Sequence, residues 1–328
     1  MLRIHFTTAA DLWNVRIRQE PHPLWEVLLS LHMLQTDQGA VLFDGWRRRS
    51  RAVLKPSVHM LTRLARPKGY SPDFLTPADD STDLETGLEV LQATGRAQLR
   101  TDMELLAAET ALPGWVVGLA NGEADVMRRL ADGIREYHAA VLQPHWQAIR
   151  SHIRADRNKR AELIVDGGME NLLKKLHPAI TWNAPVLEVD YPADQDVYLD
   201  GRGLTLVPSF FCWQKPITLV DQGMQPMLVY PAERTLGWSG VADDMTTAPR
   251  PGSLVALLGR TRAAVLRTIA DTPCLNTSEV ARMTGISLAG ASQHTTVLRE
   301  AGLVITQRHQ GSAMHKLSAR GATLLDRR

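Results

Sequence analysis

The sequence predicts an α+β fold: a mostly helical N-terminal body with a small β-sheet, followed by a C-terminal module of short helices and a β-hairpin. Three observations predict it. Apolar residues recur at helical spacing in residues 1–178, short runs rich in Val, Ile, Leu and aromatics occupy residues 179–245, and paired helix caps mark residues 253–328. We expect these stretches to be the helical body, the sheet region packed on it, and the C-terminal module.

The body is expected to consist of amphipathic helices. Residues 8–65 have helical patterning, and the run PLWEVLLSLHML within them places Trp25, Leu28 and Leu29 on one side. Residues 66–83 are rich in Pro, Asp and Ser and predict a loop. Two further helices are predicted by ADVMRRLADGIREYHAAVL and by PHWQAIRSHIRADRNKRAELIV, with Pro144 in the first turn of the second.

Strand signals replace the helical ones after residue 178. The runs are ITWN, VLEVD, DVYLD, LTLVPSFF, ITLVD and MLVYP, separated by Pro, Gly and Asp. They predict one small sheet of about four to six strands within residues 179–231, packed against the helices. The tetrapeptide DGRG, Asp200 to Gly203, predicts a hairpin turn, and residues 251–253 predict a linker to the C-terminal module.

The C-terminal module has the signals of two helices joined by a tight turn. Asn276 and Thr277 are good N-caps, and Glu279 completes a capping-box pattern with Asn276. Gly285 is expected to end this helix, because glycine adopts the left-handed conformation of a helix C-terminus at little cost. Ser287 then caps the second helix.

The second helix is expected to have one buried and one exposed side. Leu288, Ala291, Thr295 and Leu298 recur at spacings of three and four, so they predict the buried side. Gly302 stops the helix. The opposite side is polar and short, and its residues are Gly290, Ser292, Gln293, Thr296 and Arg299. Side chains of this size can approach base edges in a DNA major groove.

A β-hairpin is expected after the second helix. ITQRHQ and SAMHKLS are extended runs joined around Gln310 and Gly311. Arg308 and Gln310 would lie near the tip of this hairpin, where they can meet a phosphate or a minor groove. His309 and His315 lie across the hairpin, and we expect solvated side chains or a phosphate donor there.

This order of elements is that of a winged helix-turn-helix. Residues 253–326 resemble the ArsR class of bacterial winged-helix transcriptional regulators in LLG with R-x-R, in SEVARMTGISLAGASQHTTVLREAGLV and in LSARG. The resemblance implies a homodimer, a second helix that reads DNA and repression relieved by a ligand. The DNA-reading positions that it implies are Ser287, Gly290, Ser292, Gln293, His294 and Thr296.

The resemblance has departures. Metal-sensing members carry a cysteine pair in the first helix of the helix-turn-helix, whereas SEVARM has none. Thr295 and Thr296 stand where a leucine and a basic residue are usual, so the comparison implies slightly weaker packing and no basic phosphate contact at Thr296. The body resembles an uncharacterised domain found before ArsR-type winged helices in high-GC bacteria, through PLWEVLLSLHML and DGRGLTLVPSFFCW. That second resemblance implies no ligand and no activity.

Charge favours DNA as the partner of the module. The chain has a net charge of +2, but residues 259–328 hold ten Lys and Arg against four Asp and Glu. The module is therefore basic and the body mildly acidic, as an electrostatic DNA footprint requires. Arg260, Arg262 and Arg308 are the expected phosphate contacts. The alternative is a winged helix that binds protein, with the arginines forming an ordinary solvated face.

No catalytic, cofactor or metal site is predicted, so we expect no enzyme. The sequence lacks GxGxxG after a strand, GxxxxGK[ST], GxSxG and HExxH. His138, His145 and His152 recur every seven residues, but a proline between them breaks the register, and we expect surface or helix–helix histidines. Cys212 and Cys274 form no CxxC pair, and we find no signal peptide or long apolar run, which predicts a cytoplasmic protein.

Aromatic residues crowd the predicted strands. Trp182, Phe211, Trp213 and Trp238 lie in or beside them. Core packing is one interpretation, and a site for a small, partly apolar organic molecule is the other. Three function classes follow: a ligand-responsive transcription regulator, a regulator whose body only dimerises or binds a protein partner, and an enzyme with an appended DNA-binding module.

Overall fold

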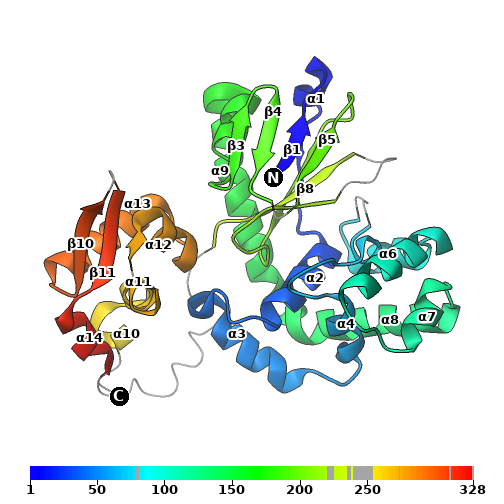
Figure 1. Cartoon of the computed structure of the whole chain (residues 1–328), viewed down its shortest axis with the longest axis horizontal. Helices are drawn as coiled ribbons and strands as arrows, with labels where there is room; N and C mark the ends of the chain where they lie inside the picture. Colours follow the sequence, from blue (N-terminus) through cyan, green and yellow to red (C-terminus); the bar gives the residue numbers. More distant parts are fainter. Residues whose placement is uncertain are drawn as a thin grey trace. The chain divides into compact units, whose positions relative to one another are not determined.

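The computed structural model describes residues 1–77, 81–191, 193–219, 225–234, 238, 254–272, 274–309 and 312–326. The chain divides into two compact units. The first comprises Met1–Asp37 and Arg47–Ala232, and the second comprises Gln38–Trp46 and Glu233–Arg328. The first unit combines helices with two sheets, and the second combines short helices with a three-stranded sheet (Figure 1). The prediction of an α+β fold is confirmed.

Helices make up most of the first unit. They are α1 (Ala9–Trp13), α2 (Pro23–Leu34), α4 (Val58–Leu64), α5 (Leu84–Gln92), α6 (Arg96–Glu109), α7 (Trp115–Ala120), α8 (Ala124–Tyr137) and α9 (Trp146–Lys174), with a short 3-10 turn at Asp73–Leu75. Helix α3 (Ala40–Val53) begins in the second unit and ends in the first. Helix α2 is the core helix, because eleven of its twelve residues are buried.

The two long helices α8 and α9 are joined without a loop. A π-helical turn at His138–Leu142 and a 3-10 turn at Gln143–His145 carry the chain from one helix to the other. Helix α9 is kinked at Gly167 and Gly168, where the backbone leaves helical geometry. The side-chain amide of Asn171 donates to the carbonyl of Leu163 at 2.7 Å and so satisfies an acceptor that the kink releases. Among the described helices, none has the length and apolar character needed to cross a membrane.

The first unit has two four-stranded sheets, whereas one was predicted. The strands are β1 (Leu2–His5), β2 (Arg16–Ile17), β3 (Ile180–Asn183), β4 (Val186–Val189), β5 (Gln195–Tyr198), β6 (Thr205–Ser209), β7 (Ile217–Leu219) and β8 (Met227–Pro231). One sheet has the order β3-β4-β1-β5 and the other β2-β6-β8-β7. Both use an N-terminal strand that the sequence did not indicate, because the partners of β1 and β2 lie far along the chain and no local pattern shows the pairing.

The DGRG segment passes the chain from one sheet to the other and is not a hairpin turn, which corrects the prediction. Strand β5 before it pairs with β1, and strand β6 after it pairs with β2 and β8. Asp200, Gly201 and Gly203 all have positive φ, as a tight turn requires. The buried carboxylate of Asp11 accepts from the backbone N–H groups of Gly201 and Gly203 at 2.8 and 3.2 Å. This carboxylate fixes the crossover.

Buried charges hold the first unit together. The carboxylate of Glu26 in α2 accepts from the backbone N–H groups of Phe210 and Phe211 at 2.8 and 3.1 Å. In α9, Arg160 pairs with Asp156 at 3.0 Å, and both side chains are almost completely buried. The hydroxyl of Tyr230 donates to the same Asp156 carboxylate at 2.8 Å. These contacts tie α2 and α9 to the sheet that contains β6 and β8.

The second unit contains a compact helical and β-hairpin module. Its elements are α10 (Leu254–Leu258), α11 (Arg260–Asp271), β9 (Leu275–Asn276), α12 (Thr277–Thr284), α13 (Leu288–Glu300), β10 (Val304–His309), β11 (Ser312–Leu317) and α14 (Ala319–Asp326). The buried core draws on α11, α12, α13 and β10. The predicted linker, residues 251–253, lies outside the described residues.

Candidate nucleic-acid interface

Helix α12 is the first helix of the helix-turn-helix, and its ends are fixed by local chemistry. The Asn276 side chain accepts from the Glu279 N–H at 2.8 Å, and the Glu279 carboxylate accepts from the Asn276 N–H at 2.7 Å. Gly285 ends the helix with φ of 70°. The predicted capping box and glycine stop are confirmed. Val280, Ala281 and Thr284 are buried, which seats α12 on the module core.

Helix α13 follows after the turn and is the candidate DNA-reading helix. The Ser287 hydroxyl accepts from the Gly290 N–H at 3.1 Å and caps the helix, as predicted. Ala291, Thr295 and Leu298 are buried, also as predicted. The Thr295 hydroxyl donates to the Ala291 carbonyl at 2.8 Å, so this buried polar group is satisfied within its own helix.

Leu288 departs from the prediction. Helical spacing placed it on the buried side, but the side chain is 56% exposed. Leu288 is the first residue of α13, so the helix provides no preceding turn to cover it. The exposed leucine and its exposed neighbour Ala289 therefore form an apolar end on an otherwise polar helix surface.

The predicted reading positions differ in how far they reach solvent. Ser292 and Gln293 are exposed, whereas Gly290 and Thr296 are half-buried. His294 is also half-buried, and its Nδ1 atom is enclosed with no hydrogen-bond partner in the described part of the chain. Burial lowers the pKa of His294, and the nearby Arg262 charge lowers it further. Among these residues, Ser292 and Gln293 are the best placed to meet base edges.

Positive side chains lie on α11 and near the C-terminal end of α13. Arg260 and Arg262, in the first turn of α11, are exposed, and no ion pair of either is found among the described residues. Arg262 is close enough to His294 to affect its pKa, which places a cation beside α13. Arg299, near the end of α13, is half-exposed and only 4.0 Å from Glu300. Such cations are suited to phosphate contact.

The wing is a two-stranded antiparallel hairpin with a third strand added at its side. Strands β10 and β11 pair from Val304 with Leu317 to His309 with Ser312, and β9 pairs with β11. The hairpin is therefore present as predicted. Gln310 and Gly311 lie outside the described residues, and the Arg308 side chain is not described, so their predicted phosphate contacts stay predictions.

His315 was expected to be solvated or to donate to a phosphate, but it is only 4% exposed. Its Nε2 lies 3.0 Å from the Thr277 hydroxyl, and its Nδ1 lies 2.9 Å from the Thr306 hydroxyl. The ring thereby joins the first residue of α12 to the two wing strands. The sequence did not indicate this contact, because the hairpin is mostly polar and Thr277, the partner in α12, is far from His315 in the chain.

The four aromatic residues predicted to hold a ligand come from different parts of the chain. Trp182 in β3 is buried and packs edge-on against Phe6, with the ring centroids 4.9 Å apart. Phe211 is buried and follows β6 in the other sheet, and Trp213, nearby in the chain, is half-buried. Trp238 belongs to the second unit, where its indole N–H donates to the Leu42 carbonyl at 2.9 Å. A common site formed by these four residues stays a prediction.

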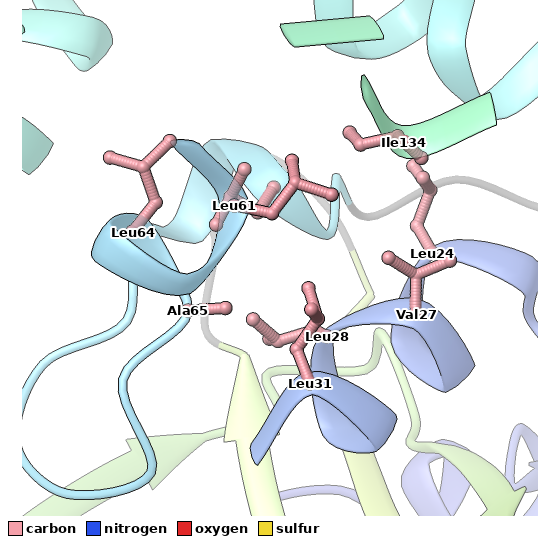
Figure 2. A pocket seen from close by; sticks show the side chains of 9 residues that line it. Leu24, Val27, Leu28, Leu31, Leu61, Leu64, Ala65 and Ile134 are labelled. Atoms are coloured by element: carbon pink, nitrogen blue, oxygen red, sulfur yellow. The ribbon is translucent and has the colours of Figure 1, made fainter. Parts of the chain in front are cut away.

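Hollows in the described part of the first unit include a small internal cavity and two open grooves. Figure 2 shows the internal cavity, which lies among apolar side chains of α2, α4 and α8 and measures about 10 Å³. A space of this size holds about one water molecule, so no organic ligand fits there. Its lining residues are Leu24, Val27, Leu28, Leu31, Leu61, Leu64, Ala65, Leu75 and Ile134.

The open grooves are larger. One, of about 660 Å³, runs between α1 and the α9 kink, and its lining includes Trp13, which is 86% exposed. The other, of about 510 Å³, lies between α4 and the start of α7, and its lining includes Arg63 and Trp115. Neither groove is lined by the four predicted aromatic residues. No three His, Cys, Asp or Glu side chains gather as metal ligands in the described ranges.

Comparison with known proteins identifies two segments. Residues 119–235 match a family of unknown function (DUF5937), and residues 258–305 match the family described as winged helix-turn-helix DNA-binding. No curated protein and no solved structure matches the chain. The second match covers α11, α12, α13 and the start of β10. The chain therefore contains a winged helix-turn-helix DNA-binding domain and is a DNA-binding protein of the transcription-regulator class.

Proposed function

We propose that the protein is a homodimeric transcriptional repressor of ArsR type that reads DNA with α13. The observation that carries this proposal is the exposed surface of α13, where Ser292 and Gln293 project from a helix capped at Ser287 and packed through Ala291 and Leu298. A glutamine in the major groove can make a bidentate contact to adenine. The ArsR assignment rests on the resemblance of residues 253–326.

Phosphate contact would come from cations around α13 and from the wing. Residues 259–328 are strongly basic, and the described Arg262 and Arg299 lie close to α13 or within it. In this proposal they hold the module on the duplex without reading its sequence, because phosphates are the same at every base pair. Arg260 and Arg308 are proposed for the same role.

Two copies are proposed to act together. One recognition helix with few long side chains offers too few base contacts for useful affinity. A two-fold dimer would place the two α13 helices one DNA turn apart, about 34–36 Å, on an inverted repeat. We propose that the first unit supplies much of the dimer surface, because two basic modules would repel each other.

The first unit is also proposed to bind a small, partly apolar organic effector. The support for this is the pair of open grooves, whose volumes of about 660 and 510 Å³ suit a small molecule. The exposed indole of Trp13 offers an apolar surface in the larger groove. An effector would change DNA affinity by as much as it discriminates between two states of the dimer, typically about 1–3 kcal/mol.

A second candidate function is a regulator whose first unit only dimerises or binds a protein partner. The burial of Trp182 and Phe211 in the cores favours it, because these aromatics then serve packing and no ligand. That the chain is not an enzyme stays a prediction.

Selection of binding sites from random duplexes tests the proposed function. We expect an inverted repeat to be enriched, and light scattering to give two chains per duplex. A metabolite library is then screened for release of the selected duplex, with Trp13→Phe as a variant of the larger groove. Failure to enrich any sequence contradicts DNA reading. If a repeat is enriched but no compound releases it, the dimerisation scaffold is the better account.

A further inference from the structure

The leading end of α13 is apolar. Leu288 and Ala289, its first two residues, are exposed, and the Leu288 side chain is 56% exposed. The core contacts of α13 are made from the other side of the helix by Ala291, Thr295 and Leu298. Truncating Leu288 would therefore leave the core of the module intact, so the leucine has no structural role that requires its size.

Hydrogen-bonding groups are scarce at this end of the helix. The Ser287 hydroxyl already accepts from the Gly290 N–H in the cap. Gly290 has no side chain, and a Cβ there would lie 3.2 Å from the Ser287 hydroxyl oxygen. His294 is turned partly inward, with its Nδ1 enclosed. The first turn of α13 therefore offers a partner mainly apolar side chains.

DNA offers one apolar feature for such a surface. In helix-turn-helix proteins the N-terminal residues of the second helix meet the base edges in the major groove. Among the bases, thymine presents a C5-methyl group there, and small apolar side chains contact it. Leu288 and Ala289 match this chemistry by position, exposure and composition.

We infer that Leu288 and Ala289 form a contact site for the C5-methyl group of a thymine in the bound duplex. The inference rests on the proposed DNA-binding function and adds to it a base that the polar side chains do not read. Ala289 and Gln293 are four residues apart and share a face of the helix. The helical rise separates them by about 6 Å, or roughly two base-pair steps, when the helix follows the groove.

The test removes the methyl group and the leucine separately and together. The full-length protein is titrated by fluorescence anisotropy against a duplex selected from a random pool. Each thymine of the duplex is replaced in turn by deoxyuridine, which lacks only the methyl group. For the unaltered protein we expect one position in each half-site where this replacement weakens binding about fourfold, the effect of losing one buried carbon group.

The same replacement should have no effect at that position on Leu288→Ala. Leu257→Ala is the matched control, because it removes an exposed leucine of the same unit, on α10, that is 68% exposed. This control should keep the fourfold loss. Circular dichroism of both variants checks that the helices are unchanged.

The outcomes separate this inference from the proposed function. If no duplex is selected at all, DNA reading fails and the inference falls with it. If a duplex is bound but no thymine methyl matters, the inference alone is overturned. It is likewise overturned if the fourfold loss persists in Leu288→Ala, because the methyl group is then read by another residue.

Discussion

The buried His315 ring is expected to be the main polar link between the wing and the helix-turn-helix. Replacing it in His315→Phe keeps a ring of similar size but removes both nitrogen atoms. The hydrogen bonds to Thr277 and Thr306, at 3.0 and 2.9 Å, are lost together. At about 1 kcal/mol net for each bond, the wing should be destabilised by about 2 kcal/mol.

Hydrogen exchange of the wing amides measures this loss, because the chain has two units and a single unfolding free energy would mix them. A loss of about 2 kcal/mol lowers the protection of the β10 and β11 amides about 30-fold. Thr306→Val, which removes one of the two bonds, should lower it about fivefold. Unaltered protection in His315→Phe would refute the assigned link. His59→Phe, an exposed histidine of the first unit, is the control.

Acid should open the same hairpin. Burial lowers the pKa of His315, and the Arg299 charge lowers it further, so the folded pKa lies below that of the unfolded chain. The neutral ring therefore favours the folded wing above the unfolded pKa of about 6.5, and this stability is lost as the pH falls below that value. Protection factors corrected for intrinsic exchange should decrease from pH 7 to pH 5, and His315→Gln should flatten that decrease. An equal pH dependence in His315→Gln contradicts the assignment.

Three further predictions concern other contacts. Arg262→Ala and Arg299→Ala should each weaken specific and non-specific DNA binding alike. Each variant should also reduce the slope of log affinity against log salt concentration by about 0.9. An unchanged slope would show that the arginine does not contact a phosphate. Asn276→Ala should destabilise the start of α12 by about 1 kcal/mol in hydrogen exchange, because both bonds of the capping box are lost, and normal protection there would contradict its role. Asp156→Asn should destabilise the first unit by about 3–5 kcal/mol in hydrogen exchange of the α9 amides, since it removes the buried carboxylate charge that pairs with Arg160. Glu170→Gln, in an exposed pair with Lys174, should change little, and equal effects would refute the importance of burial.

Local features of the fold could be predicted because a few neighbouring residues determine them. The cap at Asn276, the glycine stop at Gly285 and the buried side of α13 each depend on groups within about one or two helical turns. The hairpin was equally accessible from its two extended runs. The exposed side of α13 could therefore be placed from the sequence, and Gln293 lies on it as expected.

Features that depend on distant pairing could not be predicted. Strand β1 pairs with β4, so Leu2 meets Val189, and no local pattern indicates this partner. The sequence pattern before Phe211 indicates a strand but not which sheet that strand joins. Spacing assigned Leu288 to the buried side because it takes no account of the helix end. Leu288 is the first residue of α13, and no preceding turn covers its side chain.

The most direct test of DNA reading by α13 compares Gln293→Ala with the unaltered protein on the selected duplex and on a random duplex. Gln147→Ala, an exposed glutamine on α9, is the matched control. If α13 reads bases, the ratio of specific to non-specific affinity should fall roughly tenfold to a hundredfold in Gln293→Ala and stay constant in the control. An equal loss on both duplexes, or none, would contradict the claim that α13 reads the sequence through Gln293.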